Sequence, residues 1–121
     1  MPNAGDVLKG FYQAVIQRDF KKARTYLADS MVFVGLFETY PSADAYLTAL
    51  TGLMQITTRL DIKVVIAEGK DVAVFFELVT KEPAKATTLV AEWHQVEGGK
   101  IVHARSCFDG RPFAAMFAGK Q

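Results

Sequence analysis

The chain has 121 residues, half of them hydrophobic, and a formal net charge of +1. This length and composition predict one folded domain, residues 1–121, with a core of its own. No basic cluster stands out, which argues against nucleic acid as a partner. No apolar run approaches the roughly 20 residues that span a bilayer, so no membrane partner is expected. With Asp6 and Lys9 interrupting any apolar leader, the expected compartment is the cytoplasm.

The first third of the chain has the pattern of two helices. Asp6 suits the first turn of a helix, where a negative charge interacts favourably with the macrodipole. Apolar residues then recur at helical spacing at Leu8, Phe11 and Val15, with Tyr12 beside them. Asp19 is expected to cap a second helix over residues 20–28.

A short strand and a third helix follow. Residues 31–36 are an apolar run in which Gly35 suggests a bulge or a close backbone approach. Residues 37–41 are expected to form a loop. Ser42 then caps a helix from residue 43 to about 54. At the other end of the chain, apolar residues in the tail 110–121 could dock as one helical turn.

The centre of the chain predicts four β-strands. Valine and aromatic residues, which suit a pleated and half-buried surface, fill each of them. Paired glycines accept the positive φ angles of tight hairpins, so Gly98 and Gly99 mark one turn. The strands are expected at residues 59–68, 72–81, 87–96 and 101–108. Helices packed on one face of an antiparallel sheet give an α+β fold class.

Two segments resemble a known superfamily. Residues 18–35 (RDFKKARTYLADSMVFVG) and 98–113 (GGKIVHARSCFDGRPF) are similar to the opening and the last strand of nuclear transport factor 2-like proteins, in their SnoaL-like, ketosteroid isomerase-like branch. The resemblance implies a cystatin-like α+β fold, in which a curved antiparallel sheet wraps three N-terminal helices into an open cone. The superfamily includes isomerases, cyclases, epoxide hydrolases and dehydratases as well as binding modules.

Strand alternation groups the polar candidates by face. Glu92 and His94 lie together on one strand, and Glu77 lies on the strand before it. Periodicity alone does not identify the inner face. Superposition of this sequence on the ketosteroid isomerases of the superfamily implies that Glu77, Glu92 and His94 lie inside the cone. The other residues that it implies inside are Phe75, Val90, Ala104, Ser106 and Phe108. The same superposition places the isomerase tyrosine at Phe11, next to Tyr12, and the isomerase base at Gly35, so only Glu92 matches an isomerase acid.

Glu92, His94 and Glu77 are therefore the candidate catalytic residues. Burial of a carboxylic acid in an apolar cavity disfavours its ionised form, which prepares a general acid or base. The structural alternative is that these acids pair with His94, Arg59 or Arg105. The candidate substrate-binding residues are Phe11, Tyr12, Phe33, Met54, Phe75, Ser106 and Phe108. No organic cofactor is expected, and no metal, because the spacing of these residues matches no recognised metal motif.

Two functions fit this pattern. The first is a cofactor-independent acid–base enzyme of isomerase, cyclase, dehydratase or hydrolase type, acting on a small apolar substrate. The second is a non-catalytic module for ligand binding or dimerisation. The sheet face that the helices leave uncovered is expected to form a homodimer interface, because it would otherwise expose a large apolar patch. The residues expected on that face are Val72, Val74, Phe76, Leu78, Leu89 and Trp93.

Overall fold

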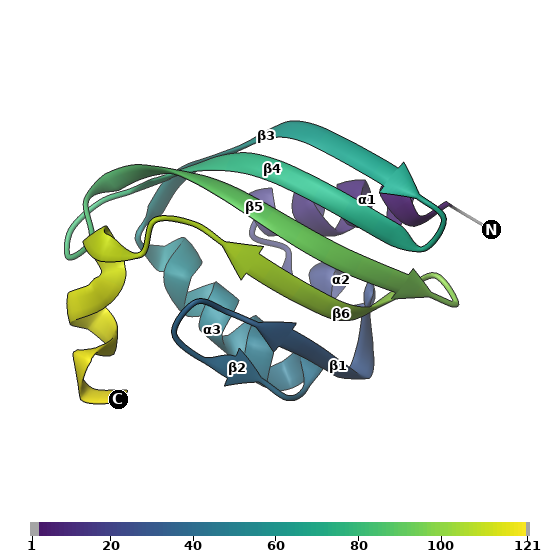
Figure 1. Cartoon of the computed structure of the whole chain (residues 1–121), viewed down its shortest axis with the longest axis horizontal. Helices are drawn as coiled ribbons and strands as arrows, with labels where there is room; N and C mark the ends of the chain where they lie inside the picture. Colours follow the sequence, from purple (N-terminus) through teal and green to yellow (C-terminus); the bar gives the residue numbers. More distant parts are fainter. Residues whose placement is uncertain (1–2, 121) are drawn as a thin grey trace.

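The computed structural model describes residues 3–120, with side chains to residue 117 (Figure 1). Three α-helices lie in the first half of the chain: α1 (Ala4–Ile16), α2 (Phe20–Arg24) and α3 (Ala43–Gln55). A 3₁₀ helix, η1 (Arg111–Lys120), follows the last strand. The strands are β1 (Leu27–Val34), β2 (Thr39–Tyr40), β3 (Thr57–Glu68), β4 (Asp71–Thr80), β5 (Ala86–Glu97) and β6 (Lys100–Cys107).

Local hydrogen bonds begin each helix where the sequence indicates. The Asp19 side chain accepts a hydrogen bond from the Lys22 backbone N–H, and the Ser42 hydroxyl accepts one from Ala45. Both predicted caps are confirmed. The second helix is shorter than the predicted 20–28, because the chain joins the sheet soon after Arg24. The backbone N–H of Ile101 donates to the Tyr26 carbonyl at 2.8 Å, which draws the chain into β1.

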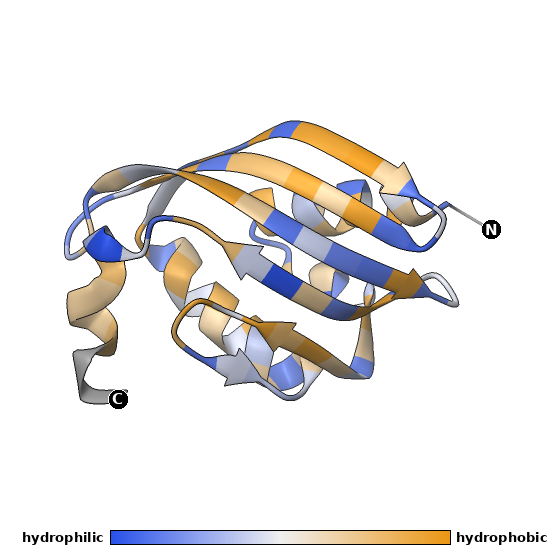
Figure 2. Cartoon of the chain, viewed as in Figure 1, coloured by the Kyte–Doolittle hydropathy of each residue, from blue (hydrophilic) through white to orange (hydrophobic). Residues whose placement is uncertain are grey.

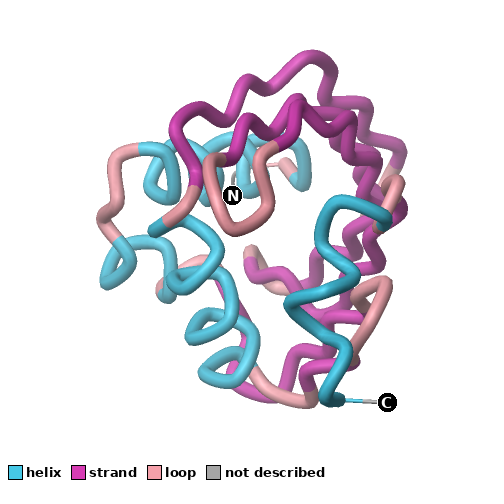
Figure 3. Tube along the Cα trace, turned by 90° about the vertical axis from the view of Figure 1, so that its left-hand side faces the viewer, coloured by secondary structure: helices cyan, strands magenta, loops and turns pink. Residues whose placement is uncertain are grey.

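The six strands form one curved sheet in the order β2-β1-β6-β5-β4-β3. The predicted antiparallel meander from β3 to β6 is confirmed, whereas β1 pairs with β6 in parallel. The sheet arches over α1 and α3 on its concave side (Figures 1 and 3). This is the α+β architecture that the sequence predicts.

Gly35 makes the close backbone approach that the sequence suggests. Its N–H donates to the Glu38 carbonyl at 2.9 Å, and this turn lets β2 fold back on β1. A Cβ atom at Gly35 would lie 2.8 Å from the same carbonyl oxygen, so a side chain is excluded there. Part of the expected loop 37–41 is therefore a short strand, because the turn brings Tyr40 opposite Phe33.

The register of the ladder determines which residues face the helices. Val74 lies opposite Glu92, and Glu92 lies opposite Ser106, so these side chains share the concave face. Glu77 lies opposite Leu89 and Phe75 opposite Ala91, on the convex face. The prediction that Phe75 and Glu77 point into the cone is therefore wrong. The superposition placed β4 one residue out of register, and such a shift moves every side chain to the other face.

The same shift corrects the composition of the uncovered face. Val72, Val74, Phe76 and Leu78 are buried against the helices, so Phe76 and Trp93 lie on opposite faces of the sheet. Figure 2 shows hydrophobic residues along the second half of β3 and most of β4, where both faces carry apolar side chains. The convex face instead presents Val64, Ile66, Phe75, Leu89 and Trp93.

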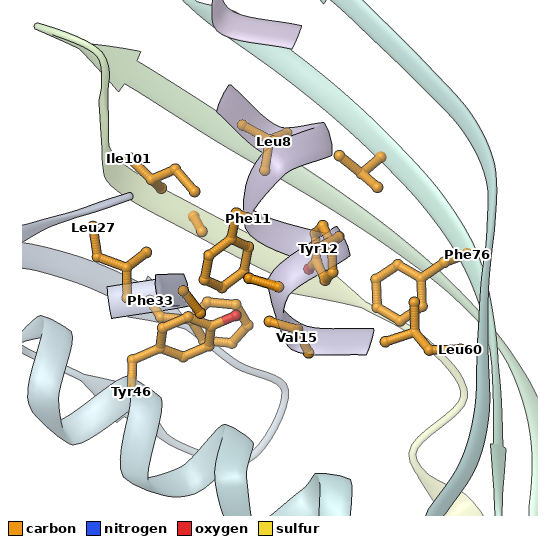
Figure 4. Close-up of a cluster of buried hydrophobic side chains, with 14 of the residues drawn as sticks. Leu8, Phe11, Tyr12, Val15, Leu27, Phe33, Tyr46, Leu60, Phe76 and Ile101 are labelled. Carbon is orange, nitrogen blue, oxygen red and sulfur yellow. The ribbon is translucent and has the colours of Figure 1, made fainter. Parts of the chain in front are cut away.

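The core lies between α1 and the concave face of the sheet (Figure 4). Leu8, Phe11 and Val15 of α1 are fully buried there and lie in one cluster with Leu27 and Ile101. The C-terminal tail forms more helix than the single turn expected. No helix in the part of the chain that the structure describes is long and apolar enough to cross a membrane.

Candidate functional site

A cavity of about 440 Å³ lies between the concave face of the sheet, α1, α3 and η1. Figure 3 shows α3 and η1 on opposite sides of one end of the molecule, with the sheet arching over both. Apolar and aromatic side chains make up most of the wall: Phe33, Leu36, Phe37, Leu50, Leu53, Met54, Leu60, Phe76, Leu78, Val90, Phe108, Phe113, Met116 and Phe117. A volume and lining of this kind suit a small organic ligand.

One carboxylate in this wall is held by two donors. The Tyr12 hydroxyl donates a hydrogen bond to Oε1 of Glu92. Nε2 of His94 lies 2.8 Å from the same oxygen. Glu92 is 7% exposed and His94 is 1% exposed, so this cluster is almost shielded from water. Two hydrogen bonds on one oxygen fix the orientation of the carboxylate.

The secondary structure places these three side chains together. Glu92 and His94 are two residues apart on β5, so strand alternation points both to the concave face. β5 lies between β4 and β6 in the sheet, which shields the pair on both sides. Tyr12 reaches them from α1, and its ring packs between Phe11 at 5.1 Å and Phe76 at 5.3 Å.

A second tyrosine lies at the same end of the cavity. Tyr46 of α3 stacks on Phe33, with ring centroids 4.3 Å apart, and it lines the cavity beside Tyr12 (Figure 4). Burial raises the pKa of Tyr12 well above 10.0, and the charge of Glu92 and the neighbouring Tyr46 raise it further. Burial and Glu92 also raise the pKa of Tyr46, while its hydrogen bond with Tyr12 lowers it. Both phenols therefore keep their protons at neutral pH.

The other carboxylate oxygen of Glu92 is available to a ligand. None of the described side chains and backbone groups hydrogen bonds to Oε2, and Glu92 is one of the residues that line the cavity. Ser106, directly opposite Glu92 on β6, lines it too and offers a hydroxyl. The site can thus accept a proton or a hydrogen bond at one oxygen while the other oxygen is held fixed.

The model of one protein family covers most of this architecture. It is the SnoaL-like domain, and it matches residues 8–104. The chain belongs to the SnoaL-like domain family. Its superfamily includes isomerases, cyclases and hydrolases. No curated protein sequence gives a significant match to the chain.

Solved structures share the fold of this SnoaL-like domain. A protein from Kribbella flavida is 20% identical with a TM-score of 0.83, and the match covers 95% of this chain and 93% of that one. A nuclear transport factor 2-like protein from Cytophaga hutchinsonii is 19% identical with a TM-score of 0.82, covering 93% and 95%. An epoxide hydrolase from M. tuberculosis is 22% identical with a TM-score of 0.75, covering 96% and 87%. At these identities the likeness shows the fold alone.

The structure brings some of the predicted site residues together and separates others. Of the predicted substrate-binding residues, Tyr12, Phe33, Met54, Ser106 and Phe108 line the cavity of the SnoaL-like domain, whereas Phe11 is buried in the core and Phe75 faces outward. Of the predicted catalytic residues, Glu92 and His94 are in contact.

Glu77 does not converge with Glu92 and His94. It lies on the convex face, and Oε1 of its side chain is 3.5 Å from Nη2 of Arg59. Pairing with Arg59 was the structural alternative for this residue. Within the described chain, no group of three or more histidine, cysteine, aspartate or glutamate side chains could hold a metal ion.

Several cavity residues were not predicted. Tyr46 of α3, Phe76 of β4 and the η1 residues Phe113, Met116 and Phe117 all line the cavity. The signal for Tyr46 was its place on the apolar side of a predicted helix, but that signal does not distinguish core from cavity. The sequence of the tail has no periodicity that would indicate where it docks. Its position depends on a contact between segments far apart in the sequence, in which Phe117 stacks on Phe37 with ring centroids 4.6 Å apart.

The raised tyrosine pKa values predict a loss of stability in alkali. A phenol whose pKa is raised in the folded state holds its proton where the unfolded chain loses it, so folding stability is complete below about pH 10 and falls as the pH rises above it. We expect Glu92→Gln to lower the pKa of Tyr12, because it removes the negative charge beside the hydroxyl. Phenolate absorbance during an alkaline titration measures this, with Tyr12→Phe assigning the signal. A Tyr12 phenolate forming below pH 10 in the folded protein would contradict the geometry.

Proposed function

We propose that this SnoaL-like domain is a cofactor-independent acid–base enzyme that acts on a small, mainly apolar molecule in the cavity. Glu92 is the residue that accepts and returns the proton. The observation that carries the proposal is the unequal use of its two oxygens in a side chain that lines the cavity: Oε1 accepts hydrogen bonds from Tyr12 and His94, while Oε2 has no partner among the described residues. An acid held in this way is a positioned general base.

The surroundings suit proton transfer. Glu92 is buried, so little water reaches the carboxylate to weaken it as a base. Tyr12 and His94 fix the orientation of the carboxylate, and His94 does not line the cavity, so its role is to position Glu92 rather than to touch the substrate. Isomerisation, cyclisation, dehydration and hydrolysis all include such a proton transfer. Hydrolysis of an epoxide is one of these candidates, supported by the shared fold of the M. tuberculosis epoxide hydrolase.

The second candidate is a non-catalytic module that binds an apolar ligand. Gly35 favours it, because this position corresponds to the isomerase base in the superposition and offers no side chain to the cavity. A binding module needs the apolar wall but not an ionised Glu92. The two candidates therefore differ in what the loss of that charge does.

A Kemp elimination tests the base without knowledge of the natural substrate. In 5-nitrobenzisoxazole, a base removes the proton on C3, the C–H electrons form the third C–N bond, and the N–O bond breaks to leave a coloured phenolate. We expect the protein to accelerate this reaction and Glu92→Gln to slow it by about 10²-fold or more, the scale of a lost general base.

Glu77→Gln is the matched control for this assay. It makes the same chemical change on the convex face, so the rate should stay at the level of the unmodified protein. If the protein accelerates the reaction but Glu92→Gln leaves the rate unchanged, Glu92 is not the base. If the protein gives no acceleration at all while apolar ligands bind, the binding module is the better description.

We also propose that the domain forms a homodimer through the convex face of the sheet. Leu89 is 62% exposed and Trp93 is 48% exposed, and Val64 and Ile66 of β3 are exposed on the same face. Contiguous exposed apolar patches of this kind mark interaction sites in soluble proteins. A twofold axis through the face would bury the patch against its own copy.

Light scattering at micromolar concentration should give the mass of a dimer. Trp93→Lys should shift it toward the monomer, because the interface would bury a charge without a partner. Gln17→Lys adds the same charge at the exposed end of α1 and should leave the mass unchanged. A monomer mass for the unmodified protein would refute the proposal.

A further inference from the structure

We infer that the cavity selects ligands by charge: it binds an apolar molecule that carries a protonated amine and rejects one that carries a carboxylate. Glu92 acts here as the ion-pair partner of the ligand. The selection by charge therefore holds whether or not Glu92 also transfers a proton. It depends on three features of the cavity: a histidine that stays neutral, a carboxylate without a cation, and an aromatic wall.

The first feature is the environment of His94. Nδ1 of its ring is buried and has no hydrogen-bond partner within the described chain, while Nε2 is bonded to Glu92. A protonated ring would carry an N–H at Nδ1 with no acceptor, which is costly in a buried site. The proton therefore lies on Nε2, where it is donated to Glu92, and the ring is neutral. His94 does not compensate the charge of Glu92.

The second feature is the absence of any other cation. None of the described residues that line the cavity is lysine, arginine or histidine, whereas a second acid, Glu38, lines it together with Glu92. Arg18 lies near the base of α3, but its guanidinium donates to the Thr57 carbonyl at 2.7 Å and does not line the cavity. A ligand in the cavity thus meets net negative charge at low dielectric, where charge interactions are strong.

The third feature is the aromatic wall of the cavity that Glu92 also lines. Tyr12, Phe33, Tyr46 and Phe76 lie close to one another at this end of the cavity (Figure 4). Aromatic faces attract cations, and ammonium groups are bound in proteins by cages of such rings. An ammonium group at Oε2 would replace its lost hydration with a charged hydrogen bond and aromatic contacts. A carboxylate would find neither, and it would be repelled by Glu92.

Three adamantane derivatives of similar shape test the selection: 1-aminoadamantane, 1-adamantanol and adamantane-1-carboxylate. Calorimetry at neutral pH should show the amine binding at least about tenfold more tightly than the alcohol, a difference of about 1.4 kcal/mol. The carboxylate should bind more weakly than the alcohol. Glu92→Gln should remove most of the advantage of the amine, and Glu77→Gln should preserve it.

The order of the three ligands on the unmodified protein is a test that needs no variant. Carboxylate binding as tight as amine binding would overturn the inference, and so would an amine advantage that survives Glu92→Gln. Binding of the alcohol shows whether that variant keeps its cavity. Competition of the amine with 5-nitrobenzisoxazole confirms a shared site. If the protein shows no preference for the amine but still accelerates the Kemp elimination through Glu92, only the charge selection is refuted. If it prefers the amine but does not accelerate the Kemp elimination, only the proposed catalysis is refuted.

Discussion

A buried carboxylate needs hydrogen-bond donors, and the two donors to Glu92 determine how the elements at the centre of the molecule are arranged. Oε1 takes one hydrogen bond from Tyr12 of α1 and one from His94 of the same strand. The first bond ties the N-terminal helix to the middle of the sheet across 80 residues of sequence. Because a buried charge that loses its partners is strongly destabilising, this contact constrains where α1 sits over β5. Glu92 and Tyr12 also line the cavity, so the same contact lies in its wall.

The rest of the cavity is formed by segments that meet only in the folded state. α3 contributes Tyr46 and Met54, the turn after β1 contributes Phe37, and η1 closes the far side with Phe113 and Phe117. The stacking of Phe37 on Phe117 joins the turn to the tail, and both rings line the cavity. The concave face is thereby divided into a dry core around Phe11 and a cavity around Glu92.

Local chemistry made much of the fold predictable from the sequence. Asp19 and Ser42 cap helices through bonds within three residues, and Gly69, Gly98 and Gly99 adopt the positive φ angles that the hairpins require. Glu92 and His94 share a face by alternation within one strand. These features depend on neighbours in sequence, so a pattern of residue types reveals them.

Features that depend on register or on distant contacts were not predictable. The faces of β4 follow from which residue of β5 lies opposite, and valine or phenylalanine on both faces of β4 gives no polar alternation to decide it. Glu77 was therefore placed on the wrong side. Tyr12 and Phe11 are adjacent on α1, and both are buried. Only the packing of the helix against Phe76 shows that Tyr12 donates to Glu92 and that Phe11 belongs to the core.

The state of the His94 ring tests the central arrangement most directly. Nitrogen-15 NMR of the imidazole distinguishes a neutral ring with its proton on Nε2 from a doubly protonated ring. The structure predicts a ring that carries its proton on Nε2, because Nδ1 has no partner among the described residues, and the hydrogen bond to Glu92 should shift this proton downfield. In Glu92→Gln the downfield shift should disappear. A doubly protonated ring, or a proton on Nδ1, would contradict the arrangement of Tyr12, Glu92 and His94 on which the proposed chemistry depends.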